Sequence, residues 1–145
     1  MRPINEMKLV FPAQSINESF ARTAVSGFAA LADPTVAELV DLRTAVSEAV
    51  TNSIVHAYRG GKGNIRLTCR LFEDGRLTVS VKDTGCGIED IEKARQPLFT
   101  TQPDAERSGL GFTVMESFCD KVTVRSRPGH GTLVTLTKKL TGQGA

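Results

Sequence analysis

Apolar residues recur at two different spacings along this chain, and each spacing predicts a different kind of element. Residues 7–11 (MKLVF) are typical of a strand. From Ile16 to Leu31 the apolar positions then recur every three to four residues, which predicts a helix. Ser15 and Glu18 have the spacing of a capping box, so this helix is expected to begin just after Ser15.

A second helix and a hairpin follow from the same kind of pattern. Asp33, as N-cap, and Pro34, in the first turn, mark the beginning of a helix that should end near residues 59–61. The spacing then changes to two, because apolar and polar residues alternate over 65–71 and again over 77–81. Two such runs separated by a short turn predict a β-hairpin.

The last third of the chain completes the expected topology. Residues 88–94 could form a short helix, and residues 96–108 have two prolines and no periodicity, which indicates a long loop of the kind that often serves as a lid. A helix over 109–119 and a closing hairpin over 122–137 come next. The order predicts an α+β fold, an α/β sandwich whose antiparallel or mixed sheet has helices packed on one face.

Composition places the chain among ordinary soluble proteins. Its 145 residues suit one domain, expected to span residues 1–145, and its net charge of +2 argues against a nucleic-acid binder. We find no apolar run that could cross a membrane and no signal-peptide pattern near the N-terminus. Cys69, Cys86 and Cys119 have neither metal-ligand spacing nor a disulfide pattern, so a cytoplasmic protein with reduced thiols is expected.

The second helix carries the first candidate for chemistry. Val46, Val50 and Ile54 form an apolar stripe, whereas Glu48 and Asn52 lie together on nearly the opposite side. A partly buried carboxylate can act as a general base, and an amide oxygen suits Mg²⁺. An exposed helical pair, or two satisfied polar groups in a core, would show the same pattern.

Two glycine-containing segments are the other candidates. Asp83, Gly85 and Gly87 follow a predicted strand, where a carboxylate can accept a hydrogen bond from an amine and glycines let a planar ligand approach the backbone. This segment is also compatible with an ordinary turn. Residues 107–111 (RSGLG) precede a helix, so their backbone N–H groups could bind phosphate, although a flexible loop end would look similar. The P-loop pattern GxxxxGK[ST] is absent.

The order and spacing of the three segments resemble a known superfamily. The patterns ExxxN (48–52), DxGxG (83–87) and GxG (109–111) are similar to the N, G1 and G2 boxes of the GHKL ATPase/kinase superfamily, which includes gyrase B, MutL and the histidine kinases. The resemblance implies the Bergerat fold and binding of ATP or ADP with Mg²⁺. The stretches NESFAR, SEAVTN, ARQPLFTT and ERSGLGFTVMESF resemble, over nearly the whole chain, the SpoIIAB family of anti-sigma-F factors of endospore-forming bacteria.

That resemblance implies partners and a role for each candidate residue. Members of the family are homodimeric serine kinases that hold a sigma-F-type factor and phosphorylate a SpoIIAA-type anti-anti-sigma protein, with no direct role for nucleic acid or membrane. By similarity, Glu48 is the catalytic base, Asn52 binds Mg²⁺, Asp83 accepts from the adenine amine and Arg22 faces the sigma factor. The remaining residues implied to bind nucleotide are Gly85, Gly87, the lid residues Thr100 and Thr101, and the phosphate-bordering Arg107, Ser108, Gly109, Leu110 and Gly111.

Other functions share parts of this pattern. A sister anti-sigma kinase of a general-stress circuit would have the same boxes and a different partner, and a binding module that uses ATP only to set its shape would not need Glu48. A histidine-kinase catalytic domain needs a dimerisation helix with a phosphorylated histidine, and neither His56 nor His130 fits that position. A gyrase-type ATPase would need transducer domains.

Overall fold

A five-stranded antiparallel sheet forms one layer of the molecule. The computed structural model describes residues 2–57, 62–88 and 111–142. The strand order in the sheet is β1-β2-β3-β5-β4, and every neighbouring pair is antiparallel. The strands are β1 (Asn5–Pro12), β2 (Asn64–Leu71), β3 (Arg76–Asp83), β4 (Lys121–Arg127) and β5 (Gly131–Lys139).

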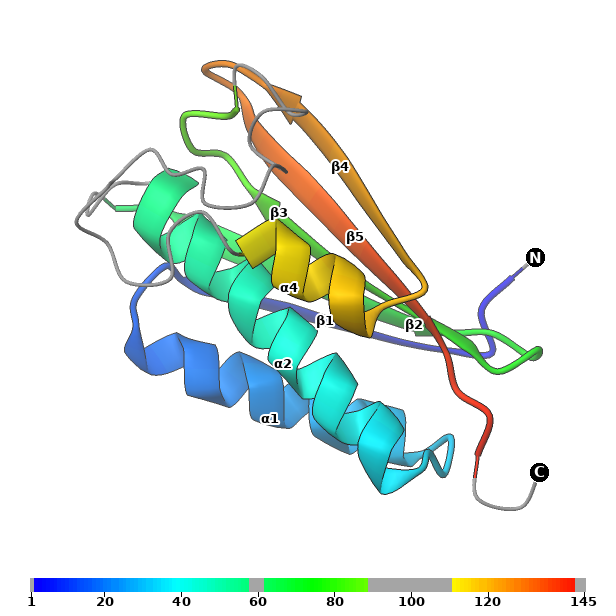
Figure 1. Ribbon diagram of the computed structural model, residues 1–145. Coiled ribbons are helices and arrows are strands. Elements are labelled where there is room, and N and C mark those ends of the chain that lie inside the picture. Colours follow the sequence, from blue (N-terminus) through cyan, green and yellow to red (C-terminus); the bar gives the residue numbers. More distant parts are fainter. Residues whose placement is uncertain (1, 58–61, 89–110, 143–145) are drawn as a thin grey trace.

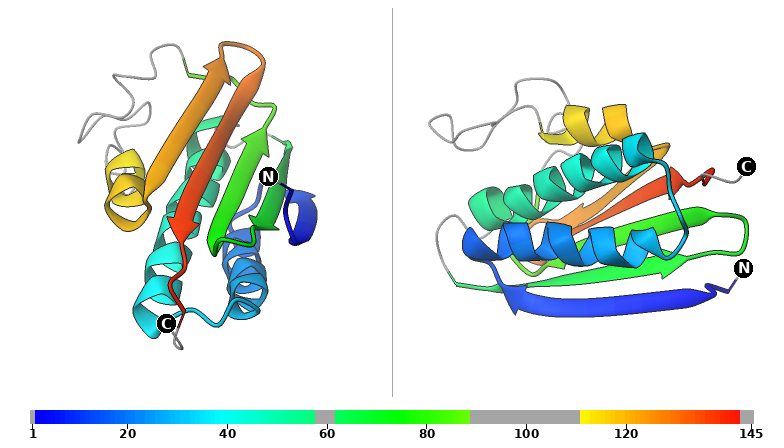
Figure 2. Two further views of the ribbon diagram at one scale, coloured as in Figure 1. Left: turned by 90° about the vertical axis from the view of Figure 1, so that its right-hand side faces the viewer. Right: turned by 90° about the horizontal axis from the view of Figure 1, so that it is seen from below.

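Helices cover one face of this sheet and leave the other face open (Figures 1 and 2). Helix α1 (Ile16–Ala30) lies beside α2 (Val36–Asn52), and α4 (Gly111–Phe118) lies on the other side of α2. A π-helical turn, η1 (Ser53–Ala57), extends α2 at its C-terminal end. Helix α2 is therefore the central helix, with a neighbour on each side and the sheet beneath it.

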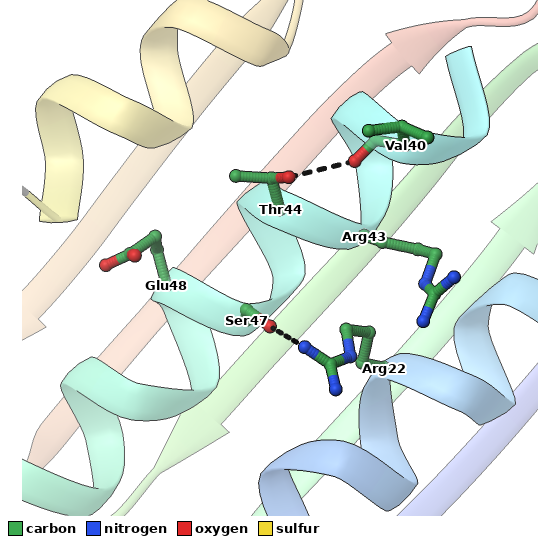
Figure 3. A pocket seen from close by; sticks show the side chains of 6 residues that line it. All are labelled: Arg22, Val40, Arg43, Thr44, Ser47 and Glu48. Carbon is green, nitrogen blue, oxygen red and sulfur yellow. Dashed lines mark hydrogen bonds between the residues drawn. The ribbon is translucent and has the colours of Figure 1, made fainter. Parts of the chain in front are cut away.

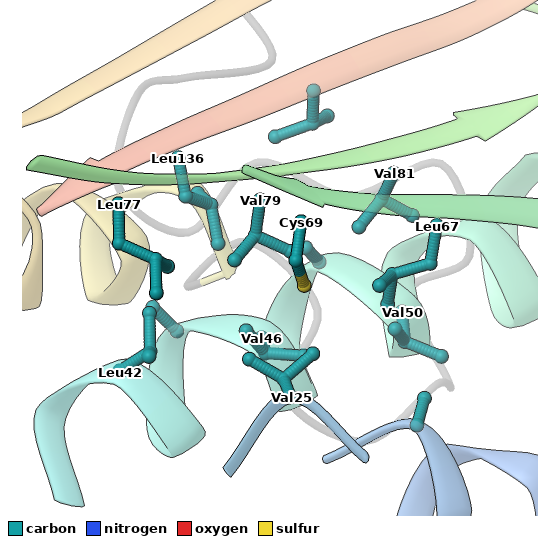
Figure 4. Packing of buried hydrophobic residues seen from close by; sticks show 14 of the residues in the cluster. Val25, Leu42, Val46, Val50, Leu67, Cys69, Leu77, Val79, Val81 and Leu136 are labelled. Carbon is teal, nitrogen blue, oxygen red and sulfur yellow. The ribbon is translucent and has the colours of Figure 1, made fainter. Parts of the chain in front are cut away.

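The core lies between α2 and the inner face of the sheet (Figure 4). Alternate residues of β2 and β3 are buried, as expected for strands with one covered face. Burial of these side chains supplies most of the driving force that holds the helices on the sheet. The fully buried residues with the largest side chains include Val25, Leu42, Val46, Val50, Ile65, Leu67, Leu77, Val79, Val81, Met115 and Leu136.

The predicted topology is confirmed for the described residues. The strand at 7–11, both hairpins and the three helices form as expected, and the fold is an α+β sandwich with helices on one face. The predicted mixed alternative is not used, since all pairings are antiparallel. Three expectations fall wholly or mostly outside the described residues, namely a helix end at 59–61, a short helix over 88–94 and a loop over 96–108.

The predicted beginning of the second helix was wrong. Thr35, rather than Asp33, is the N-cap, because its hydroxyl accepts the Glu38 N–H at 3.1 Å while Glu38 Oε1 accepts the Thr35 N–H at 2.8 Å. Asp33 has a φ of 51° and belongs to the preceding turn. The pattern Thr-x-x-Glu at 35–38 is a capping-box signature that was visible in the sequence.

The capping box expected at the first helix, by contrast, does not form. Helix α1 begins where predicted, but the backbone of Ser15 is helical and its side chain makes no cap hydrogen bond. The carboxylate of Glu18, the expected partner, instead accepts a hydrogen bond from Ser47 of α2 and lies 3.7 Å from the guanidinium of Arg22. A tertiary contact has therefore replaced the local cap.

The three cysteines are free thiols, as the sequence predicts. Burial raises the pKa of Cys69 to about 12 and, as the largest cause, that of Cys119 to about 11, which keeps both thiols protonated and unreactive. Cys86 is exposed. Among the described helices, none combines the length and apolar character that crossing a membrane requires.

Candidate functional site

Helix α2 presents different chemistry on its two sides. Val46 and Val50 are fully buried against the sheet, as the apolar stripe predicts. Glu48 and Asn52 are only partly buried. They are four residues apart, so they share the side of α2 that turns away from the sheet. The polar pair therefore belongs to a surface that other elements border, and the site is built outward from it.

Asn52 is in contact with the beginning of α4. A Cβ atom placed on Gly111 would lie 2.9 Å from both Oδ1 and Nδ2 of Asn52. Cβ atoms in proteins essentially never approach another heavy atom that closely. Only glycine at position 111 leaves the Asn52 amide where it is. The N-terminus of α4, where the first backbone N–H groups of a helix have no partner within the helix itself, is thus held directly against the amide of α2.

Asp83, at the end of β3, is buried with 4% of its surface exposed and is fixed by three donors. Its Oδ1 accepts the backbone N–H of Gly85 at 3.0 Å and that of Thr132 at 3.2 Å, and its Oδ2 accepts the Ser53 hydroxyl at 3.0 Å. Burial raises the pKa of Asp83, and the three hydrogen bonds oppose that rise without cancelling it.

Ser53 connects Asp83 to the polar pair, and sequence reasoning missed it. It follows Asn52 directly and begins the π-helical turn, a feature that often occurs at functional sites. Its side chain is buried, and its hydroxyl satisfies the carboxylate of Asp83 from the opposite layer of the sandwich. The serine after the Glu-x-x-x-Asn pattern was the available signal, although its partner could not be known without the fold.

Gly87 is packed against the protein backbone, whereas the sequence suggested that a planar ligand approaches it. Its φ is 77°, and a side chain there would overlap the carbonyl oxygen of Arg127 at the end of β4. The glycine therefore lets the loop after β3 pack against the β4–β5 turn. The backbone N–H of Ile88 also donates to Ser126 Oγ at 2.7 Å, which fastens the same loop to β4.

Arg22 lies at an open pocket between α1 and α2 (Figure 3). The pocket has a volume of about 340 Å³, and Glu48 borders it on the α2 side. In Figure 3 the side chain of Glu48 points to the side of α2 away from Arg22. Both arginines of the pocket, Arg22 and Arg43, extend into the space between the helices, and the other lining residues are Val40, Thr44 and Ser47.

The structure thus brings together the first two predicted segments and the last residue of the third. Asn52, Asp83 and Gly111 converge around the C-terminal end of α2, with Glu48 one turn away and Gly85 bonded to Asp83. The other predicted residues of the lid and the phosphate-binding segment lie outside the described residues, namely Thr100, Thr101, Arg107, Ser108, Gly109 and Leu110.

The residues present fit a nucleotide with a magnesium ion. A carboxylate has about four lone-pair positions, and described donors fill three on Asp83, so one remains for an amine. No group of three or more acidic, histidine or cysteine side chains that could hold a metal occurs among the described residues. The amide oxygen of Asn52 is a hard ligand of the kind that Mg²⁺ binds, since this ion typically takes one or two protein oxygens and completes its shell with phosphates and water.

Comparison with known proteins defines the class of this fold and site. The model of the histidine kinase-like ATPase domain family matches residues 11–138. The catalytic domain of the histidine kinase ThkA shares the fold with a TM-score of 0.58 at 14% identity, over 94% of this chain and 97% of that one. The RsbU and RsbW domains of a Mycobacterium tuberculosis protein give a TM-score of 0.69 at 21% identity, over 95% of this chain and 33% of that one. The chain is therefore a histidine kinase-like ATPase domain of the GHKL type.

Sequence relatives narrow the class further. The anti-sigma F factor of Clostridium acetobutylicum is 54% identical over 135 residues, which cover 93% of this chain and 94% of that protein. That of Geobacillus stearothermophilus is 54% identical over 134 residues, covering 92% of each chain. The chain belongs to the family of anti-sigma F factors, as the sequence motifs predict.

Proposed function

We propose that this protein is an anti-sigma factor that holds a sigma-F-type factor and uses Mg-ATP to phosphorylate a serine of a SpoIIAA-type anti-anti-sigma protein. The anti-sigma part rests on its similarity to anti-sigma F factors, which match it over nearly their whole length. A cytoplasmic location and a homodimer are part of the same proposal.

One observation carries the kinase half of the proposal. Glu48 stands one helical turn before Asn52, and Asn52 is pressed against Gly111 at the N-terminus of α4. A helix N-terminus favours phosphate, because its free N–H groups and its dipole attract negative charge. A carboxylate beside such a position can accept the proton of an attacking serine hydroxyl, which is the step that phosphoryl transfer to protein requires.

The opposite end of the site supports adenine recognition. Asp83 is buried and ordered by Ser53, Gly85 and Thr132, so its remaining acceptor position has a fixed direction. A buried acceptor that is left unpaired costs free energy, and a bound exocyclic amine would satisfy it. In this proposal Asp83 recognises the adenine, Asn52 binds Mg²⁺ and Glu48 is the general base that activates the acceptor serine.

The outer surface of α1 and α2 supports a protein partner. Phe20, Val36 and Val40 lie on these two adjacent helices and expose 56%, 76% and 53% of their surface, so apolar area is available there to a partner. The side chain of Arg22, a residue of α1, lines the pocket between α1 and α2. We propose that the sigma factor docks here and contacts Arg22. Arg22→Ala should weaken sigma binding at least tenfold, and unchanged binding would remove Arg22 from this role.

The decisive experiment is phosphoryl transfer followed by intact mass. The protein is mixed with Mg-ATP and the anti-anti-sigma protein encoded by the same genome, and both masses are measured. We expect one added phosphate on the partner, and a loss of at least 100-fold in rate with Glu48→Gln while ATP binding is retained, because a positioned base contributes about 10²–10⁴ in rate.

Each other outcome excludes a part of the proposal. Equal transfer by the wild type and Glu48→Gln would remove Glu48 as the base. Inorganic phosphate released with an unmodified partner would indicate an ATPase. Bound ATP without turnover would indicate a nucleotide-gated binding module, and transfer only to a partner from a general-stress circuit would assign the protein to the sister class.

A further inference from the structure

A buried serine connects the proposed partner-binding helix to the helix that carries Glu48. Ser47 exposes 7% of its surface and sits in α2 immediately before Glu48. Its hydroxyl donates to Glu18 Oε1 of α1 and accepts a hydrogen bond from Arg22 Nη1 at 3.4 Å. Arg22 Nη1 also lies 3.7 Å from Glu18 Oε1, so the three side chains form a closed cluster across the two helices.

This cluster determines where the guanidinium of Arg22 lies. Its Nη2 approaches Ser19 Oγ at 3.5 Å, while its Nε is buried with no acceptor among the described residues. An unsatisfied buried donor is unfavourable, so the position is not one that Arg22 would adopt for its own hydrogen bonding. Glu18 and Ser47 hold the side chain on the α2 side, at the pocket between the helices. Figure 3 shows the hydrogen bond between Ser47 and Arg22.

Holding a long side chain in place has a consequence for binding. A free arginine loses rotamer entropy when a partner immobilises it, and a side chain already fixed in the unbound protein does not. Arg43 also extends into the same pocket, so an unrestrained Arg22 would move away from a second positive charge. Ser47 counteracts this movement through its hydrogen bonds to both members of the Glu18–Arg22 pair.

We propose that Ser47 is a positioning residue, which holds the guanidinium of Arg22 in place and so presents it to the protein partner. This inference rests on the proposed function, because it assumes that Arg22 contacts a partner.

The test separates partner binding from nucleotide binding. With Ser47→Ala, the Kd for the sigma-F-type factor of the same genome should rise about fivefold, since Arg22 must then be ordered on binding. The KM for the anti-anti-sigma protein should rise by a similar factor, with kcat and the Kd for ATP unchanged. Ser26→Ala is the matched control. The Ser26 hydroxyl donates to the backbone carbonyl of Arg22 at 2.9 Å and not to its guanidinium, so this substitution should leave all four values as they are.

A double-mutant cycle distinguishes positioning from a general structural role. If Ser47 acts through Arg22, Ser47→Ala should have no further effect on sigma binding in an Arg22→Ala background. Ser47→Thr, which keeps the hydroxyl, should restore most of the lost affinity. Independent effects of the two substitutions, an equal loss of ATP affinity, or unchanged partner binding in Ser47→Ala would overturn the inference. A wild-type protein that neither binds sigma factor nor transfers phosphate would instead overturn the proposed function.

Discussion

The two ends of α2 each have a carboxylate beside them that accepts several hydrogen bonds, yet the pKa values of the two carboxylates are shifted in opposite directions. At the beginning of the helix, Glu38 accepts from the Thr35 N–H and from both the backbone N–H and the hydroxyl of Thr141. Beside the end of the helix, Asp83 accepts from Ser53, Gly85 and Thr132.

The difference lies in the balance between burial and hydrogen bonding. At Glu38, desolvation raises the pKa, but the hydrogen bonds from Thr141, Thr35 and Gly142 together outweigh it and lower the pKa to about 2. At Asp83, burial is the stronger influence and the pKa is raised. A carboxylate that is fully satisfied fastens the C-terminal segment to the helix, whereas one that remains destabilised in its charged form is available to a ligand donor.

The largest expected effect concerns Asp83, the carboxylate proposed to bind the nucleotide. Asp83→Asn should lower the affinity for ATP and ADP by about 10- to 100-fold, because the amide can present a donor where the adenine amine needs an acceptor. Titration calorimetry with ADP measures this loss. Glu38→Gln, at the other end of the same helix, is the control and should bind ADP as the wild type does. Equal ADP affinity in Asp83→Asn would contradict the assignment of Asp83.

A smaller effect is expected from the contact between α2 and α4. Gly111→Ala places a Cβ against the Asn52 amide, which can move because it is the end of a flexible side chain. The fold should therefore survive, while the affinity for Mg-ATP falls about tenfold and the preference for Mg-ATP over metal-free ATP diminishes.

Gly27→Ala supplies the matched control for that substitution. Gly27 lies in α1, and a Cβ there would meet nothing within 4 Å. The change should leave nucleotide binding unaltered and raise the free energy of unfolding by up to about 1 kcal/mol through helix propensity. Unimpaired Mg-ATP binding by Gly111→Ala would show that Asn52 does not need its observed position.

Glu38, at the beginning of α2, should make the stability of the fold depend on pH. The pKa of Glu38 is about 2 in the folded protein and 4.5 as its ordinary value, so its contribution is present above pH 4.5 and is lost as the pH falls toward 2. Glu38→Gln should lower the free energy of unfolding by about 1–2 kcal/mol at pH 7 and by progressively less toward pH 2. Urea unfolding at a series of pH values measures the difference.

Asp83 should contribute to the pH dependence with the opposite sign. Its raised pKa favours the protonated form in the folded state, so its contribution is fully present below its ordinary pKa of 3.8 and is lost as the pH rises through the folded value. In Asp83→Asn the free energy of unfolding should therefore fall more steeply on acidification than in the wild type. A parallel pH profile for the two proteins would argue against burial as the dominant influence on Asp83.

The smallest expected effects compare the two helix beginnings. Thr35→Ala removes a capping hydroxyl and should cost about 1 kcal/mol of stability. Ser15→Ala removes a hydroxyl that makes no cap hydrogen bond, so the free energy of unfolding should change by less than about 0.5 kcal/mol. Chemical denaturation of both variants checks the contrast, and an equal loss at Ser15 would mean that this residue caps α1 in solution.

The pattern along the chain determined the secondary structure because side-chain periodicity depends only on the local geometry of helices and strands. Alternation in β2 and β3 and the apolar stripe of Val46 and Val50 predicted which residues are buried, and the structure confirms both. Motif spacing likewise indicated Glu48, Asn52, Asp83 and Gly111, since the boxes of the superfamily are short and local.

Contacts between distant segments could be decided only by the tertiary structure. The hydrogen bond from Ser53 to Asp83 joins a helix to a strand 30 positions away. Glu18, expected to cap α1 locally, instead accepts a hydrogen bond from Ser47, 29 positions along the chain. A side chain takes whichever partner the packed fold brings within reach, and a sequence pattern contains only the nearby candidates. The sequence indicated which residues are candidates for the chemistry, whereas the packing of α1, α2 and the sheet decided which of these candidates lie side by side.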